Sequence, residues 1–157
     1  MSTKNFIGLE LDATQATINS LNGLLANLQV YYTNLRGLHW DIKGDKFFEL
    51  HELYEEYYNH EASAIDEVAE RIVKLGGHPE NRFSEYLKTS DIQEINSVSD
   101  WEVGLNNIVS SLKTLLEKYH NLLKQANETS DAGTASLAIK QISNIETNLW
   151  KLTAYLG

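Results

Sequence analysis

Hydrophobic residues recur every three or four positions along four long stretches of the chain, which is the spacing of one face of an α-helix. In the first stretch the series is Ile18, Leu21, Leu25, Leu28, Tyr32 and Leu35, and its next step is His39. Asp12 and Gln15 resemble an N-terminal capping pair. The pattern therefore predicts a helix from about residue 12 to about residue 38.

The other three stretches have the same period. The second, from about Phe47 to Leu75, has an apolar stripe of Phe47, Tyr54, Tyr58, Ile65, Val68 and Ile72. Gly76 and Gly77, followed by the only proline, end it. The third follows a Ser99 and Glu102 capping box and continues through Leu105, Ile108, Leu112, Leu115, Tyr119 and Leu122. Asp131 opens the fourth, which continues through Ile142, Ile145, Leu149, Leu152 and Leu156.

Residues 78–98 are polar and show no sustained period, so they form a long connection between the second and third helices. We expect one short helix there, at either Phe83–Leu87 or Ile92–Ile95. Four long helices with one long crossover predict an all-α, ferritin-like four-helix bundle, and one proline among 157 residues disfavours an all-β chain. The length predicts a single domain over residues 1–157. Such a topology serves many functions.

The net charge of −9 disfavours a nucleic-acid partner, because proteins that bind nucleic acid normally carry a clustered basic surface. The first twelve residues offer only Lys4 as a base. The chain has no cysteine, so any metal must be held by His, Asp and Glu. No long apolar segment or secretory signal is visible, and we expect a cytoplasmic protein that does not enter a membrane.

Two pairs of possible metal ligands lie on the second predicted helix. His51 and Glu55 are four residues apart, as are Asp66 and Glu70, and all four fall within an arc of about 100°. The centres of the two pairs are about 22 Å apart along the helix, too far for one metal centre. If two copies of the helix cross antiparallel near residues 60 and 61, each pair meets the other pair of a second subunit, and twofold symmetry creates two identical sites.

The same arc carries small and apolar residues, namely Phe48, Ala62, Ala69 and Val73. A helix with a second, half-apolar face normally packs against a second partner. This pattern predicts a subunit interface on the face that holds the four ligand candidates.

His39 ends the core-facing series of the first helix, where it can lean toward His51, and the oxidisable Trp40 follows it. Two imidazoles and three carboxylates suit Fe(II), Mn(II) or Zn(II). The competing interpretation is an acidic, solvated helix face with two incidental histidines.

Glu117 and His120 form one Glu-x-x-His pair, a spacing that di-iron bundles use twice within a chain.

Specific short motifs in residues 34–77 resemble the Dps family of mini-ferritins. They are Gly37-Leu38-His39-Trp40, Phe47-Phe48, Leu50-His51-Glu52, Asp66-Glu67-Val68-Ala69-Glu70-Arg71 and Gly76-Gly77. The segments Gly133-Thr134, Leu149-Trp150 and Ala154–Gly157 are similar to the family's last helix, so the resemblance covers essentially the whole chain.

The resemblance implies a hollow shell of twelve subunits that oxidises Fe(II), preferentially with hydrogen peroxide, and stores ferric mineral. It places the ferroxidase ligands, which hold iron and are the catalytic residues, at His39, His51 and Glu55 of one subunit and Asp66 and Glu70 of its twofold mate. Position 55 is more often Asp in the family. The resemblance also implies an acidic pore near the start of the last helix, for which Asp131 and Glu146 are candidates here.

The sequence thus predicts an iron-storage ferroxidase in which iron and hydrogen peroxide are substrates and the chain is a homo-oligomer. DNA binding is not expected. The alternatives are a DNA-compacting stress protein and a helical dimer that holds a structural metal without redox activity.

Overall fold

The computed structural model describes residues 4–157, in which five helices follow one another along the chain. They are α1 (Leu11–Asp41), α2 (Phe47–Lys74), α3 (Phe83–Thr89), α4 (Trp101–Glu128) and α5 (Ala132–Leu156). The four long helices correspond to the four periodic stretches of the sequence. The short helix α3 confirms the first of the two positions expected in the crossover, because residues 92–95 are not helical.

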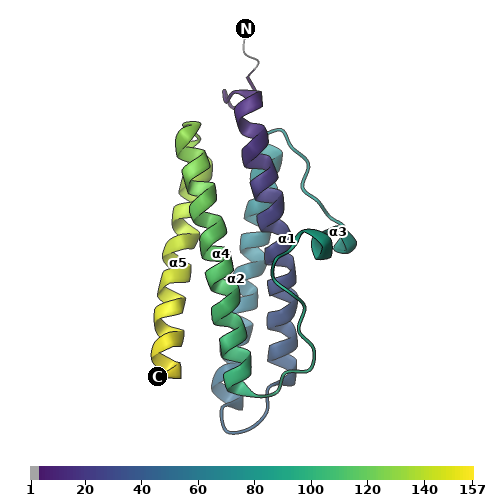
Figure 1. The fold of residues 1–157 in the computed structure, drawn as a ribbon, viewed down its shortest axis with the longest axis vertical. Helices are drawn as coiled ribbons and strands as arrows, with labels where there is room; N and C mark the ends of the chain where they lie inside the picture. Colours follow the sequence, from purple (N-terminus) through teal and green to yellow (C-terminus); the bar gives the residue numbers. More distant parts are fainter. Residues whose placement is uncertain (1–3) are drawn as a thin grey trace.

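The four long helices stand side by side, and α3 lies outside them against α1 (Figure 1). Helix α1 packs against α2 and α4, and α4 packs against α5. Because α2 and α4 run in the same direction, the chain must return along the whole bundle between them, and residues 75–100 do so on the outer side of α1. This is the all-α, ferritin-like arrangement that the helix pattern predicts.

The core lies along the middle of the bundle and is built mainly from leucine, isoleucine and tyrosine. The largest side chains that are almost fully enclosed are Tyr31, Tyr54, Tyr119, Leu21, Leu24, Leu25, Leu28, Leu35, Leu38, Leu50, Ile72 and Leu75. In the part of the chain that the structure describes, no helix is both long and apolar enough to cross a membrane.

The helix ends confirm one predicted cap and correct two others. Asp131 caps α5 by accepting a hydrogen bond from the Thr134 amide at 3.0 Å. The predicted pair Asp12 and Gln15 is wrong, because α1 begins earlier and its cap residue Glu10 makes no side-chain cap bond. The predicted Ser99 box is also wrong, since Asp100 accepts from the Val103 amide at 2.9 Å. A carboxylate one position later caps the helix instead, and it bonds an amide one residue further along the first turn.

Two buried asparagines of α1 hold the polar crossover in place. The side-chain oxygen of Asn27 accepts from the amides of Asp91 and Ile92 at 3.0 and 3.1 Å. The side chain of Asn34 donates to the Gln93 carbonyl at 2.9 Å and accepts from the Ile95 amide at 3.1 Å. A segment without a hydrophobic period is therefore fixed by hydrogen bonds from the neighbouring helix.

Candidate metal site

His39 and His51 meet where the end of α1 lies against the start of α2. Their rings stack with centroids 3.7 Å apart and an angle of 14° between the planes. His39 is buried and His51 is partly exposed. The ring of Phe47, one turn before His51, stacks on the other side of the His51 ring at 4.8 Å. The imidazole of His51 is thus held between two rings.

A reciprocal pair of hydrogen bonds sets the orientation of both imidazoles. His39 Nδ1 donates to the carbonyl oxygen of His51 at 2.6 Å, and His51 Nδ1 donates to the carbonyl oxygen of His39 at 2.8 Å. A carbonyl oxygen can only accept, so each Nδ1 carries the hydrogen. In the neutral ring Nε2 then keeps its lone pair, which is the form that binds a metal ion.

Glu55 lies one turn beyond His51 and is exposed. The hydroxyl of Tyr58 donates to Glu55 Oε1 at 3.4 Å, and the Tyr58 ring meets the His39 ring edge to face at 5.3 Å. Burial, followed by the charge of Glu55, raises the pKa of the Tyr58 hydroxyl above its ordinary value. The hydrophobic pattern of the sequence predicts Tyr58 only as a member of the apolar stripe of this helix. Its position three residues after Glu55 was the signal that it could contact this carboxylate.

Asp66 and Glu70 are exposed on the later half of α2. Within residues 4–157 of one protomer, no three His, Asp or Glu side chains come together in a way that could hold a metal ion. A protomer therefore brings His39 and His51 together, with Glu55 one turn away, and leaves Asp66 and Glu70 apart from them. A second protomer is needed if all five residues are to form one site.

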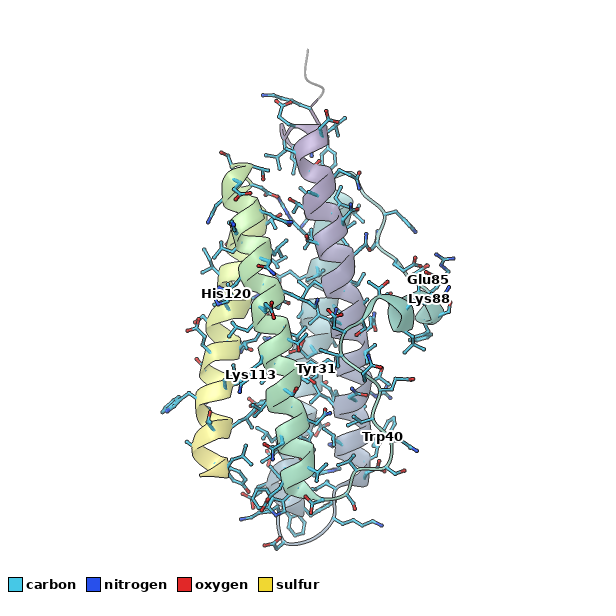
Figure 2. The ribbon with its side chains drawn as sticks, in the orientation of Figure 1. Tyr31, Trp40, Glu85, Lys88, Lys113 and His120 are labelled. Carbon is cyan, nitrogen blue, oxygen red and sulfur yellow. The ribbon has the colours of Figure 1, made fainter. Side chains whose placement is uncertain are left out.

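Apolar side chains lie uncovered on the face of α2 that carries the ligand candidates. Phe48 is 86% exposed and Val73 is 54% exposed, one near each end of the helix. At the end of α1, Trp40 (Figure 2) is 65% exposed, and the Arg36 guanidinium lies 4.9 Å from the centre of its ring. Uncovered aromatic side chains beside unused metal-binding groups are typical of a surface that a partner covers.

Asp131, one of the two pore candidates, has a different environment. Its Oδ1 lies 2.5 Å from Arg71 Nη2, its Oδ2 accepts from the Thr134 hydroxyl, and its side chain is 1% exposed. A Cβ atom on Gly133 would lie 2.6 Å from Arg71 Nη1, so only glycine leaves room for the guanidinium there. The expectation that Asp131 lines a pore is therefore wrong for this chain, because its carboxylate is enclosed and fully bonded. Glu146 is exposed.

The remaining histidines are not part of this arrangement. His60 Nε2 lies 3.0 Å from the Gln141 side-chain oxygen and links α2 to α5. His120 and Glu117 are exposed on α4, and Figure 2 shows His120 on the outer side of that helix. His78 is exposed after the end of α2.

Comparison with known proteins places this geometry in a family. Residues 18–157 match the model of the ferritin-like domain. The chain is 45% identical over 148 residues to the DNA protection during starvation protein of Porphyromonas gingivalis. This alignment covers 94% of this chain and 93% of the relative. It is 34% identical over 144 residues to general stress protein 20U of Bacillus subtilis, covering 92% of this chain and 99% of the relative.

The solved structures agree with the sequence relatives. The crystal structure of a Dps protein from Vibrio cholerae O1, a member of a broad superfamily of ferritin-like diiron-carboxylate proteins, matches with a TM-score of 0.97 and 41% identity. The match covers 100% of this chain and 98% of that one. A Dps protein from Bacillus brevis matches with a TM-score of 0.90 and 29% identity over 93% of this chain and 98% of that one.

The fold and the matches define a ferritin-like protein. Within that class, the chain belongs to the Dps family.

Proposed function

We propose that this protein is an iron-storage ferroxidase that assembles as a hollow dodecamer and oxidises Fe(II), preferentially with hydrogen peroxide. The observation that supports it best is the His39–His51 pair, whose two Nδ1 atoms are occupied by carbonyl oxygens while both Nε2 atoms stay available. The Vibrio cholerae relative, described as a ferritin-like diiron-carboxylate protein, supports iron as the metal.

In this proposal the site forms between two protomers. His39, His51 and Glu55 of one protomer face Asp66 and Glu70 of the other, and Phe48 and Val73 are covered by the same contact. The imidazoles orient the iron, and the carboxylates stabilise the higher charge of Fe(III), since hard oxygen ligands suit it. Two Fe(II) ions each give one electron to hydrogen peroxide, which takes up two protons and becomes two water molecules. A two-electron reduction releases no hydroxyl radical.

Subunit complementation tests whether the site is shared. One variant combines His51→Ala with Glu55→Ala, and the other combines Asp66→Ala with Glu70→Ala. Each alone should be inactive when anaerobic protein is mixed with Fe(II) and peroxide and ferric absorbance is followed. After the two are unfolded together and reassembled in equal amounts, each mixed dimer regains one intact site of its two, so roughly a quarter of the activity should return by random pairing.

The outcome separates a shared site from one within a protomer. If all ligands came from one chain, no mixture of the two variants could contain a complete site, and activity would stay at the background. Wild-type protein that is unfolded and reassembled in the same way controls for losses during the procedure. A spin trap in the wild-type reaction should report little hydroxyl radical.

Assembly size distinguishes the proposal from a helical dimer with a structural metal. Twelve chains of 17.8 kDa give about 214 kDa, whereas two give about 36 kDa. Size-exclusion chromatography with light scattering should return the larger mass, and a species of two chains would contradict the shell.

Duplex binding is the second candidate, because several relatives are named for DNA protection. The net charge of −9 opposes it, since a duplex is a polyanion and its binding depends on basic contacts. A gel-shift assay at low salt should show no tight complex with duplex DNA. A complex that weakens steeply with added salt would favour the second candidate.

A further inference from the structure

One side chain joins a carboxylate of the candidate metal site to the histidine pair. The Tyr58 hydroxyl donates to Glu55 Oε1 at 3.4 Å, and the Tyr58 ring lies edge to face against the His39 ring with centroids 5.3 Å apart. Tyr58 and Glu55 belong to α2, whereas His39 belongs to α1. A residue that is not itself a ligand candidate therefore contacts two candidates on two helices.

The ring of Tyr58 is held between two side chains of α1. Tyr32 meets it edge to face, with centroids 6.1 Å apart and an angle of 90° between the planes. Tyr32 and His39 are two turns apart on one face of α1, which is about 10.5 Å along the helix. Because its contacts with Tyr32 and His39 are 6.1 and 5.3 Å long, the Tyr58 ring lies between them. The packing of α1 on α2 thus sets the position of the hydroxyl.

The direction of the hydrogen bond follows from its two groups. A tyrosine hydroxyl keeps its hydrogen at neutral pH, because the ordinary pKa of this group is about 10. An ionised carboxylate can only accept. The bond is made to Oε1 and does not involve Oε2, so a Glu55 carboxylate held in this way can still give an oxygen to a metal ion.

Glu55 gains from such a restraint because its side chain is long and exposed. An exposed glutamate samples many rotamers, and a metal ion that binds it must select one of them at a cost in conformational entropy. A hydrogen bond made before the metal ion arrives has already restricted the side chain. Groups that orient a ligand in this way strengthen metal binding.

Packing alone does not account for the hydroxyl of Tyr58. A phenylalanine would keep both ring contacts with α1 and would fill the same place on the apolar stripe of α2. The hydroxyl is the part of the side chain that reaches Glu55. Removing it therefore separates a role in the site from a role in the core.

We propose that Tyr58 is a positioning residue of the metal site, whose hydroxyl holds the Glu55 carboxylate beside the histidine pair before a metal ion binds. Its ring is anchored by Tyr32 and His39, and it acts through Glu55 without being a ligand. This inference rests on the proposed function, because it takes Glu55 and the two histidines as ligands.

Metal affinity of the assembled, metal-free protein tests the role without turnover. Anaerobic calorimetric titration with Fe(II), and with Zn(II) as a redox-inert probe, gives the dissociation constant. Tyr58→Phe should raise it about tenfold, the smaller of the effects that residues behind a ligand have, because this bond is exposed. Tyr57→Phe removes the hydroxyl of the neighbouring, buried tyrosine and should change the constant less than about twofold.

A second background shows whether the effect passes through Glu55. The bond is already 3.4 Å long, and an aspartate draws the carboxylate back by one C–C bond, about 1.5 Å, so Tyr58 cannot reach it in Glu55→Asp. Adding Tyr58→Phe to Glu55→Asp should therefore change the dissociation constant less than about twofold. A tenfold effect that persists in this background would overturn the proposal, and so would wild-type affinity in Tyr58→Phe itself.

The same titration distinguishes this proposal from the function on which it rests. If Glu55→Ala binds metal as tightly as the wild type, Glu55 is not a ligand and both proposals are wrong. If Glu55→Ala binds weakly while Tyr58→Phe binds normally, only the positioning role is wrong.

A crystal of the wild-type protein soaked with Zn(II) gives a test that needs no variant. The Tyr58 hydroxyl should lie within about 3.2 Å of the Glu55 carboxylate while that carboxylate contacts the metal ion. A metal-bound Glu55 that has moved away from Tyr58 would contradict the proposal.

Discussion

Two polar clusters of this protein join parts of the chain that are far apart, but they differ in what they leave unused. The Arg71, Asp131 and Thr134 cluster joins α2 to α5, and each oxygen of the buried carboxylate has a donor. The His39 and His51 pair joins α1 to α2, and each ring has used one nitrogen only. The first cluster is complete within a protomer, and the second is not. Binding capacity therefore lies where polar groups are oriented but still lack partners.

The complete cluster should give the largest effect on stability. Arg71→Met leaves the Asp131 carboxylate buried without a cation, and removing one partner of a buried pair costs about 3–5 kcal/mol. The apparent free energy of unfolding, measured by urea denaturation at fixed protomer concentration, should fall by that amount. Lys140→Met, which breaks the exposed pair with Glu67, is the control and should cost less than about 1 kcal/mol. Equal losses in the two variants would show that burial does not matter.

The incomplete cluster should give its largest effect on activity. His51→Ala removes a proposed ligand and the ring that His39 stacks against, and peroxide-dependent Fe(II) oxidation should fall at least about 100-fold, because even residues behind a ligand contribute 10- to 100-fold. Stopped-flow absorbance measures this rate. His60→Ala, on the same helix, should keep the wild-type rate within about twofold, since His60 contacts Gln141 instead. A His51→Ala protein with the wild-type rate would remove this pair from the reaction.

The smallest expected loss of stability concerns Asp100, an aspartate that caps a helix without a buried cation beside it. Asp100 caps α4 in an exposed position, whereas Asp131 caps α5 against Arg71. Asp100→Ala should cost about 1 kcal/mol of unfolding free energy, the usual value for a lost N-cap. Ser99→Ala should cost almost nothing, because Ser99 is not the cap residue. If Ser99→Ala were the more destabilising change, the assignment of the cap would be wrong.

The periodic positions of the sequence predicted the four long helices and the crossover, because apolar spacing is a local property of the chain. They also suggested that His39 leans toward His51. The same pattern missed Glu61, although its spacing from Tyr57 and Ala64 continues a buried series. A charged residue counts against a core position in any sequence pattern, and only the folded structure, in which Glu61 is buried, shows that it is enclosed.

Asp131 illustrates the other limit. The sequence placed it at the start of the helix, which depends on the next three residues. The family resemblance implied that it lines a pore, which depends on the direction its carboxylate faces. Arg71, sixty residues earlier, decides that direction.

The sequence alone determined where helices begin and end to within a few residues, and which side chains can chelate a metal. The tertiary structure decided which of those groups are satisfied internally, namely Asp131, and which keep a free nitrogen, namely His39 and His51. The physical reason is that helix periodicity is set by neighbours three and four residues away, whereas hydrogen-bond satisfaction depends on groups that folding brings together from distant positions.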